Sequence, residues 1–200
     1  MYQPFSFSLI HSWSIRVKRL PDTRPTRDIL YVSGRVITGD TLHVFVVHAP
    51  SRRGGERESR PYRLQVASQL AEAVDSIYAL QSRAKIIVAG DFNDYHDSPA
   101  LEYLYQHHLI NISAGARGSH GGKGPLTGGN GEWRSLDQIL LSESMQHQEN
   151  ACRIGDLPFL LEDDEKYGGK KPYRTYLGPR YLGGYSDHLP LVARIRIDDK

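Results

Sequence analysis

The sequence predicts a single α/β domain, and two observations support this class. Apolar residues recur at helical spacing from Arg63 to Leu80, between a strand that ends near Val47 and another that begins at Ile86. The strand from Ile86 to Ala89 is apolar and rich in β-branched residues, which is typical of a strand buried in a sheet. With 200 residues, of which 39% are hydrophobic and 24% charged, the chain is long enough to form one core.

The region before the helix predicts antiparallel strands. Apolar and polar residues alternate over Phe5–Leu9 and Ser14–Val17, so two half-exposed strands are expected there. The proline-bearing segment Pro21–Arg27 is expected to be a loop. The turn residues Gly39 and Asp40 predict a hairpin, whose strands are expected at Ile29–Ser33, Arg35–Ile37 and Leu42–Val47.

The remaining elements are predicted from local signals. The segment Arg52–Arg60 contains glycines and arginines and is expected to be a loop. Ser98 and Pro99 fit the N-cap and the first position of a short helix that ends near Tyr105. Strands are expected at Leu136–Ser142 and Leu189–Ile197, and irregular structure at Ala114–Gly131 and Cys152–Gly184.

Composition narrows the class of protein. A formal net charge of +2 is too small to predict nucleic-acid binding through overall charge, so such binding requires a local basic patch. The single cysteine, Cys152, excludes an intramolecular disulfide framework. No apolar run approaches the length of a membrane span, and the N-terminus lacks the features of a secretory signal peptide. These observations leave the cellular compartment open.

Polar side chains stand at the ends of four predicted strands. They are His48, the pair Asp91 and Asn93, Asp137, and the pair Asp187 and His188. Taken singly, a polar residue at a strand end more often meets solvent or caps a turn. Because ligands bind at the carboxyl ends of strands in α/β sheets, the set as a whole favours one shared functional rim.

The segments around these residues resemble a known family. Val88–Asn93, Ser135–Ser142 and Ser186–Pro190 are similar to three signatures of the endonuclease/exonuclease/phosphatase superfamily, which has the DNase I-like fold. Val46–Ser51 is similar to the histidine-bearing strand end of that superfamily. The order and the approximate spacing of the four segments also match. Together they span most of the chain, which makes the resemblance specific.

The resemblance implies both a fold and an activity. The fold is a four-layer α/β sandwich in which two mostly antiparallel sheets face each other. The activity is hydrolysis of a phosphoester, as a phosphodiesterase, nuclease or phosphatase, by in-line attack of an activated water. Mg²⁺ or Mn²⁺ is the implied cofactor, because a divalent ion neutralises charge that grows on the phosphoryl and leaving oxygens.

The resemblance also implies roles for individual residues. Asp187 resembles the aspartate that ligates the metal, and His188 the histidine that acts as base or phosphate ligand. Asp137 resembles the carboxylate that orients this histidine. Asp91 and Asn93 resemble the pair that orients the attacking water and binds the scissile phosphate. His48 resembles the second histidine of the catalytic set.

Substrate contacts are expected from two other places. Arg27 stands just before a strand and is a candidate phosphate contact. The segment Lys166–Arg180 mixes basic residues with tyrosines, so Arg174 and Tyr176 could grip a phosphodiester backbone and stack on a ring. An equally acceptable interpretation of this segment is a solvated lid. The shared motifs do not separate DNA, RNA, inositol phosphates and sphingomyelin as substrates.

The family pattern starts before this chain does. Its opening strand ends in an asparagine and a later strand ends in a metal-binding glutamate, and both precede the part that Tyr2–Phe5 resembles. We therefore expect residues 1–200 to form one N-terminally truncated domain. Its exposed sheet edge is expected to favour self-association. The alternative function is an inactive fragment, or a non-catalytic module of the same fold that binds a phosphate ligand.

Overall fold

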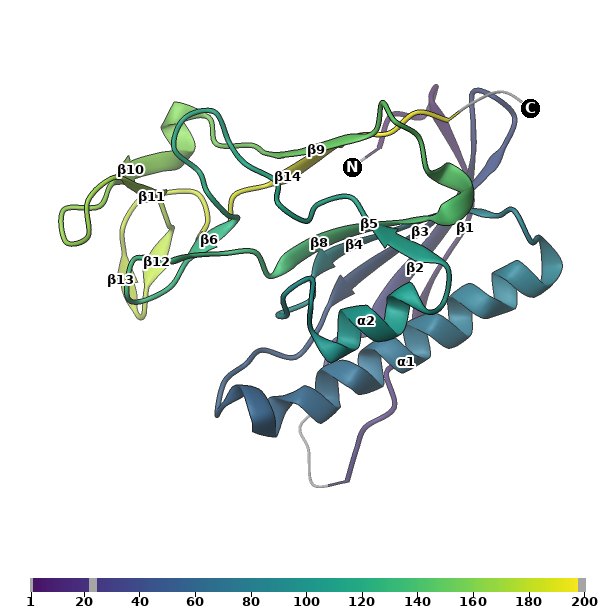
Figure 1. Ribbon diagram of the computed structural model, residues 1–200, viewed down its shortest axis with the longest axis horizontal. Coiled ribbons are helices and arrows are strands. Elements are labelled where there is room, and N and C mark those ends of the chain that lie inside the picture. Colours follow the sequence, from purple (N-terminus) through teal and green to yellow (C-terminus); the bar gives the residue numbers. More distant parts are fainter. Residues whose placement is uncertain (1, 22–24, 198–200) are drawn as a thin grey trace.

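The computed structural model describes residues 2–21 and 25–197, and a six-stranded mixed sheet forms its centre (Figure 1). In spatial order the strands are β1 (Phe7–Ile15), β2 (Ile29–Val36), β3 (Thr41–His48), β4 (Lys85–Asp91), β8 (Asp137–Ser142) and β5 (Leu109–Asn111). Neighbouring strands are antiparallel except for β3 and β4. These two strands are parallel because a long helix connects them.

That helix, α1 (Glu56–Leu80), and the shorter α2 (Pro99–Tyr105) cover one face of the sheet (Figure 1). Val66, Leu70 and Val74 of α1 are almost fully buried there, because their spacing puts them on one side of the helix. They pack with Phe45 and Val88 of the sheet in the largest hydrophobic core. This core fixes β3 and β4 relative to each other.

The opposite face of the sheet is covered only in part. The two-stranded pair β9 (Ala151–Ile154) and β14 (Leu191–Arg194) lies on this side (Figure 1), and Ile195 packs with Leu42 and Leu141 in a smaller core. Leu30 and Val46 are directly paired across β2 and β3, yet they are 40% and 43% exposed. An apolar strip of the sheet therefore faces solvent.

The remaining elements are short. They are η1 (Glu143–Met145), η2 (Pro158–Leu160), β6 (Leu126–Thr127), β7 (Trp133–Arg134), β10 (Leu161–Asp163), β11 (Lys170–Pro172), β12 (Tyr176–Leu177) and β13 (Arg180–Tyr181). The hairpins β6–β7, β10–β11 and β12–β13 gather in an extension at the left of Figure 1. Among the residues described, no helix is long and apolar enough to cross a membrane.

A buried aspartate organises the glycine-rich loop beside this extension. Asp156 is 1% exposed and accepts backbone hydrogen bonds from Ser119, His120 and Gly122 at 2.9, 2.6 and 2.9 Å. Burial acts to raise the pKa of Asp156, but these hydrogen bonds outweigh it and hold the pKa below its usual value. The side chain also fills the space beside Gly118, where a Cβ would collide with it.

The structure confirms the α/β class, the β2–β3 hairpin, α2 and β8, and corrects several boundaries. The expected strands Phe5–Leu9 and Ser14–Val17 are one strand, β1, with an irregularity between Leu9 and His11 that shifts the pairing register. Such a bulge disturbs the period-two alternation, and the sequence pattern consequently looked like two strands. The closing strand is also shorter than Leu189–Ile197, since only Leu191–Arg194 pair with β9.

The start of α1 is the largest correction. The helix begins at Glu56, so the second half of the expected loop Arg52–Arg60 is helical. Pro61 lies inside the helix and removes one backbone N–H donor, which normally indicates a break. The Arg63 guanidinium lies within 3.4 Å of the Glu56 carbonyl oxygen and supports this first turn.

Two other irregular regions contain short strands. Ala114–Gly131 includes β6, and Cys152–Gly184 includes the β10–β11 and β12–β13 hairpins. Ser98 occupies the N-cap position of α2 and Pro99 the first helical position, but the Ser98 hydroxyl makes no capping hydrogen bond. The expected loop Pro21–Arg27 lies in part outside the described residues.

Candidate active site

Sheet register brings three of the candidate residues into one row. Because β3 and β4 are parallel, they end at the same edge, and His48 is the register partner of Asp91. Strand β8 begins at this edge, and its first residue, Asp137, is the partner of Asp91 on the other side. Paired residues point to the same face of a sheet, so the three side chains share one face. We call His48, Asp91 and Asp137 the rim row.

The rim row lies on the face that β9 and β14 partly cover, and His188 joins it from the segment before β14. The imidazole Nδ1 of His188 is 2.7 Å from Oδ2 of Asp137. Leu189, the next residue, is buried and donates its backbone N–H to the Pro125 carbonyl oxygen at 2.7 Å. The position of His188 is therefore fixed on both sides.

The hydrogen bond with Asp137 raises the pKa of His188 above its ordinary value. Burial opposes this shift, and the charges of Asp137, Asp91 and Asp187 reinforce it. The Nδ1 atom is occupied by Asp137, so Nε2 is the ring atom left for a ligand. A cavity of about 350 Å³ lies against Asp137 and His188. The pair thus lines a cavity and favours the charged form of the His188 ring.

The turn after β4 holds Asp91 and Asn93 together. Gly90 has φ 145°, and a Cβ there would collide with the Val47 carbonyl group, so glycine is required. Asn93 has φ 50°, in the left-handed region. Its backbone N–H donates to Oδ1 of Asp91 at 2.7 Å, and its Nδ2 donates to Oδ2 of Asp91 at 3.1 Å and to the Ala49 carbonyl oxygen at 3.0 Å.

These contacts define what the two side chains can still bind. An amide nitrogen has two protons, and both of those on Asn93 Nδ2 are used, so Oδ1 is the atom that can accept a hydrogen bond from a ligand. Burial raises the pKa of the Asp91 carboxyl, opposed by the Asn93 hydrogen bond and reinforced by the charge of Asp137. His48 Nε2 lies 3.6 Å from Asp91 Oδ2, and its side chain is half exposed.

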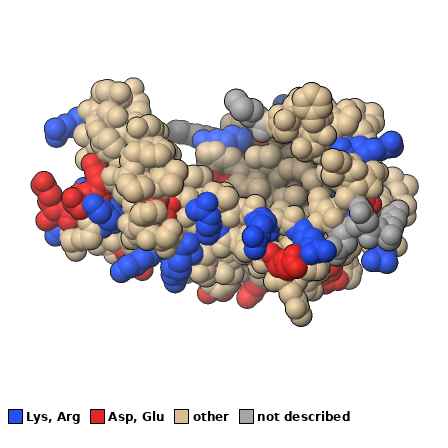
Figure 2. All heavy atoms as spheres, turned by 90° about the horizontal axis from the view of Figure 1, so that it is seen from above, with Lys and Arg blue, Asp and Glu red and all other residues tan. Residues whose placement is uncertain are grey.

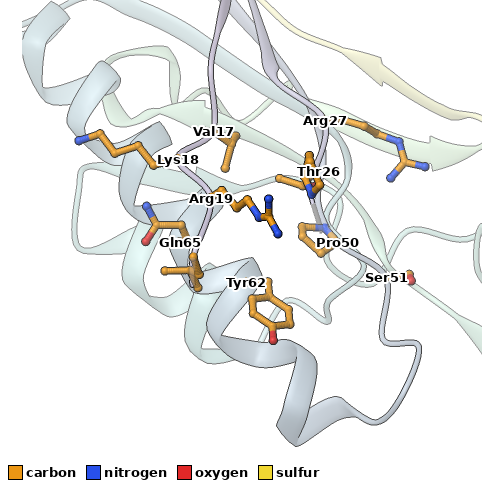
Figure 3. Close-up of a pocket in the computed structure, with 11 residues that line it drawn as sticks. Val17, Lys18, Arg19, Thr26, Arg27, Pro50, Ser51, Tyr62 and Gln65 are labelled. Carbon is orange, nitrogen blue, oxygen red and sulfur yellow. The ribbon is translucent and has the colours of Figure 1, made fainter. Parts of the chain in front are cut away.

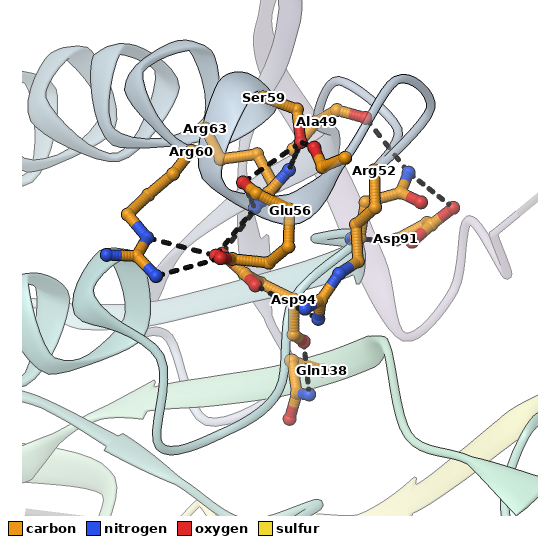
Figure 4. A network of polar contacts seen from close by, with 11 residues as sticks. Ala49, Arg52, Glu56, Ser59, Arg60, Arg63, Asp91, Asp94 and Gln138 are labelled. Atoms are coloured by element: carbon orange, nitrogen blue, oxygen red, sulfur yellow. Dashed lines mark hydrogen bonds and ion pairs between the residues drawn. The ribbon is translucent and has the colours of Figure 1, made fainter.

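A buried ion pair that the sequence analysis missed supports this turn (Figure 4). Arg63 and Asp94 are 1% and 2% exposed, and Arg63 Nε donates to Asp94 Oδ2 at 2.8 Å. Ser59 Oγ accepts a second hydrogen bond from Arg63 at 2.8 Å, and Gln138 donates to the Asp94 carbonyl oxygen at 3.1 Å. Since Asp94 directly follows Asn93, the network anchors the turn to α1 and β8.

A signal for this pair was present in the sequence. Arg63 falls at the spacing of Val66 and Leu70, on the apolar side of the helix. A charged residue on a buried helix face needs a buried partner, because an unpaired charge in a core costs several kcal/mol, roughly 3–5 when one partner is removed. The sequence alone did not show which acidic residue is that partner, because Asp94 lies 31 positions further along the chain.

The other predicted site residues do not belong to the rim row. Asp187 is exposed next to His188 and acts on it through its charge. Arg27 is exposed and lines a separate pocket with Pro50 and Ser51. Arg174 and Tyr176 belong to the β12–β13 region at the left of Figure 1, and within the described part of the chain no contact joins them to the rim row.

The rim does not by itself make a metal centre. Within residues 2–21 and 25–197, no group of three His, Cys, Asp or Glu side chains could hold a metal ion. The carboxylate of Asp137 already receives His188, and that of Asp91 receives Asn93. Asp187 offers the hard oxygen ligands that Mg²⁺ and Mn²⁺ prefer, but one carboxylate is not a complete ligand set.

Solved structures with the DNase I-like fold resemble this chain. A mannosyl-6-phosphatase of Bacteroides thetaiotaomicron aligns with 98% of this chain and 69% of its own, at 14% identity and a TM-score of 0.66. Truncated Caenorhabditis elegans TDP2 aligns with 95% of this chain and 66% of its own, at 16% identity and a TM-score of 0.58. At these identities the likeness concerns the fold.

The human Nocturnin catalytic domain, solved with a bound sulfate anion, aligns with 96% of this chain and 61% of its own, at 19% identity and a TM-score of 0.53. No curated protein sequence matches the chain significantly. A family model does match, and it covers residues 1–197. The chain therefore belongs to the endonuclease/exonuclease/phosphatase family of phosphoester hydrolases.

Proposed function

We propose that this chain carries the catalytic rim of an enzyme that hydrolyses a phosphodiester or a phosphomonoester by in-line attack of water. The observation that carries the proposal is the Asp137–His188 pair, whose 2.7 Å hydrogen bond stands in the same row as Asp91 and His48. A phosphoryl group is anionic, and an imidazolium with one available N–H is a suitable partner for it.

His188 acts as the phosphate ligand in this proposal. Its raised pKa keeps the ring protonated to higher pH, so Nε2–H can donate to a phosphoryl oxygen and stabilise the charge that grows there. A general base at this position would need the neutral ring, which the Asp137 carboxylate disfavours. Asp137 is thus a positioning residue that holds both the orientation and the charge of the imidazole.

Asp91 and Asn93 are proposed to handle the attacking water. The raised pKa of Asp91 makes it a stronger base, and it can accept a proton from water as the bond to phosphorus forms. Asn93 Oδ1 can accept the other water proton and so set the line of attack. His48, 3.6 Å from Asp91, would assist as a second donor to the phosphoryl group.

We also propose that activity depends on Mg²⁺ or Mn²⁺, as the family membership suggests. Asp187 would supply one oxygen ligand, and the ion would neutralise negative charge on the phosphoryl group. The described residues leave the metal ligand set incomplete, so the roles proposed for His188, Asp91 and Asn93 do not involve the ion.

The four-layer sandwich belongs to the same proposal. Its support is the layer formed by α1 and α2, the six-stranded sheet, and the β9–β14 pair on the other side of that sheet. The treatment of residues 1–200 as one domain, preceded in the family pattern by further strands, remains a prediction.

A second candidate function is a non-catalytic module that binds a phosphate ligand, or an inactive fragment. The incomplete metal ligand set favours it. As for the substrate, the face shown in Figure 2 carries Lys and Arg side chains across its middle, and Asp and Glu mainly at the left and along the lower edge. The +2 net charge disfavours a dedicated binder of duplex DNA, although nucleic acid stays among the candidate phosphoesters.

Hydrolysis of bis-p-nitrophenyl phosphate and of p-nitrophenyl phosphate separates the two functions. The chain with Mg²⁺ or Mn²⁺ is expected to release p-nitrophenol, and His188→Ala is expected to be at least about a hundredfold slower. Equal rates in both proteins would overturn the role of His188. Inorganic phosphate binding to both proteins, with no turnover in either, would instead establish the binding module.

A further inference from the structure

The segment that follows β3 runs alongside the turn that follows β4. Ala49 is the first residue of this segment, and its backbone N–H donates to the Asp91 carbonyl oxygen at 2.9 Å. The Ala49 carbonyl oxygen in turn accepts Asn93 Nδ2 at 3.0 Å. Three residues further on, Arg52 contacts the next two residues of the turn. The two segments are therefore joined at two levels, and the first level includes Asp91 and Asn93.

At the second level, Asp94 is shared between two arginines. Its Oδ2 atom accepts the hydrogen bond of the buried Arg63, and Arg52 Nη1 lies 3.6 Å from its other oxygen, Oδ1. Figure 4 shows the Arg52 side chain extending from the segment after β3 toward Asp94. The Arg52 guanidinium carbon also lies 5.0 Å from the centroid of the Tyr95 ring. We call the contacts of Arg52 with Asp94 and Tyr95 the arginine clasp.

The arginine clasp differs from the Arg63 contact in exposure and in length. The Arg63 side chain is 1% exposed, whereas that of Arg52 is 29% exposed. Arg52 Nη1 is out of reach of solvent and forms no hydrogen bond with any residue that the structure describes. A partly exposed ion pair of this kind contributes little to stability, because solvent screens it. The clasp is therefore better suited to restrict the position of the segment than to stabilise the fold.

The segment between Ala49 and Arg52 is open on one side. Pro50 and Ser51, the two residues between them, line a pocket of about 580 Å³ (Figure 3). Because open space adjoins the segment there, its position depends on the contacts at its two ends. These contacts are the hydrogen bonds of Ala49 at one end and the arginine clasp at the other.

The position of Ala49 bears directly on the proposed chemistry. Asn93 Nδ2 donates one of its two protons to the Ala49 carbonyl oxygen, which leaves Oδ1 to accept a proton of the attacking water. If the segment moves, this hydrogen bond lengthens and the carboxamide can rotate. His48 directly precedes Ala49, so its ring, 3.6 Å from Asp91, would move with the segment.

We propose that Arg52 is a positioning residue for the hydrolytic reaction. Through the arginine clasp it holds Ala49 against Asn93, and so keeps the Asn93 carboxamide and the His48 ring in the orientation that the water and the phosphate require. This inference rests on the proposed function, which supplies the water and the phosphate. Arg52 does not itself contact the substrate in this proposal. Its loss is therefore expected to slow the chemical step without weakening substrate binding.

The kinetics of bis-p-nitrophenyl phosphate hydrolysis in three arginine variants test the proposal. Arg52→Gln is expected to lower kcat about tenfold and to leave KM within about twofold, because misplaced reacting groups slow the step that they catalyse. Arg52→Lys keeps a cation beside Asp94 and Tyr95 and is expected to recover part of this loss. Arg53→Gln removes the exposed neighbouring arginine and is the matched control, expected to keep the wild-type kcat.

The Tyr95 side of the clasp provides a second matched pair. Tyr95→Phe keeps the ring beside the Arg52 guanidinium and is expected to keep kcat. Tyr95→Leu removes the ring and is expected to lower kcat. The melting temperature of Arg52→Gln is expected to stay close to that of the wild type, because the ion pair is partly exposed.

Four results would overturn the proposal. They are an unchanged kcat in Arg52→Gln, a rise of KM alone, an equal loss of kcat in Arg53→Gln, and a large fall in the melting temperature of Arg52→Gln. NMR spectra separate this inference from the proposed function, because the signals of the Asn93 side-chain amide and the His48 ring are expected to shift in Arg52→Gln even without turnover. Shifted signals in a chain that hydrolyses nothing would refute the enzyme and keep the clasp. Hydrolysis with unshifted signals would do the reverse.

Discussion

At the scale of single residues, the Asp137 carboxylate decides which form of His188 faces the cavity. It binds Nδ1 at 2.7 Å and raises the pKa of the imidazole. Because this folded-state pKa lies above the unfolded value of about 6.5, the stability gained is fully present below pH 6.5. It is lost as pH rises through the folded pKa.

Replacing Asp137 tests this electrostatic account. In Asp137→Asn the strongest contribution that raises the pKa of His188 is removed, so that pKa is expected to fall, as burial then dominates. NMR titration of the His188 ring against pH measures the change. His48→Gln serves as the comparison, since it leaves the Asp137 contact in place. A pKa of His188 that is equal in wild type and Asp137→Asn would contradict the assignment.

The backbone of Asn93 offers a second test at this scale. Its φ of 50° is costly for a residue with a Cβ, and the side-chain hydrogen bonds of the asparagine hold it there. Asn93→Ala and Asn93→Gly lose the same side chain, but only glycine accepts the conformation freely. The alanine variant is expected to be less stable than the glycine variant by about 1 kcal/mol in urea unfolding. The reverse order would contradict the strain argument.

Residue identities at strand ends were predictable from the sequence, but their partners were not. Apolar runs that a polar residue follows or opens indicated His48, Asp91 and Asp137. Their common row depends on β8 pairing with β4 in one particular register, and a shift by one residue would move Asp137 to the other face. The contact of Asp137 with His188 joins positions 51 apart in the chain, which no local pattern encodes.

At the scale of elements, α1 and the turn after β4 behave as one unit because of Arg63 and Asp94. Removing Arg63 leaves the buried Asp94 with only the longer contact to Arg52, whose Nη1 lies 3.6 Å from Asp94 Oδ1. Arg63→Ala is therefore expected to lower the free energy of unfolding by roughly 3–5 kcal/mol. Chemical denaturation measures this change.

A matched control comes from the same helix. Arg60 pairs with Glu56 at 2.8 Å, but its side chain is 43% exposed. Arg60→Ala is expected to cost much less than Arg63→Ala, because solvent screens exposed pairs. A similar loss of stability in Arg60→Ala and Arg63→Ala would show that burial does not set the strength of the Arg63 contact.

The elements also show where local signals mislead. Gly54, Gly55 and Pro61 indicate a break, yet the helix starts directly after Gly55. Arg63 contacts Ser59 and the Glu56 carbonyl oxygen, and Ser59 Oγ donates to the Gly55 carbonyl oxygen at 2.5 Å. These side-chain contacts stabilise the first turn despite the proline. Such compensation depends on tertiary structure and is not visible in propensities.

At the scale of the whole molecule, the exposed apolar strip and the edge strand β1 favour self-association. Leu30 and Val46 are paired across two strands and both are exposed, and β1 is exposed along most of its length. Light scattering at high concentration is expected to report a mass above the 22.6 kDa of one chain. Leu30→Lys is expected to lower that mass, and a wild-type chain that stays monomeric would contradict the prediction.

The overall class was predictable and the extension was not. The strand, helix, strand pattern gave the sheet and α1, because hydrophobic periodicity is strong over long segments. The extension consists of two- and three-residue strands, and the loop beside it is held by the contacts of Asp156 with Ser119 and Gly122. Segments this short carry no periodicity, and only the folded chain brings their partners together.

The most direct test of the central claim is the pH dependence of kcat for bis-p-nitrophenyl phosphate in wild type and Asp137→Asn. If the His188 imidazolium binds the reacting phosphate, the wild-type rate falls as pH rises through the raised pKa of His188. In Asp137→Asn this fall is predicted at lower pH. A descending limb at the same pH in both proteins would contradict the claim that the Asp137–His188 pair is the catalytic centre of the rim.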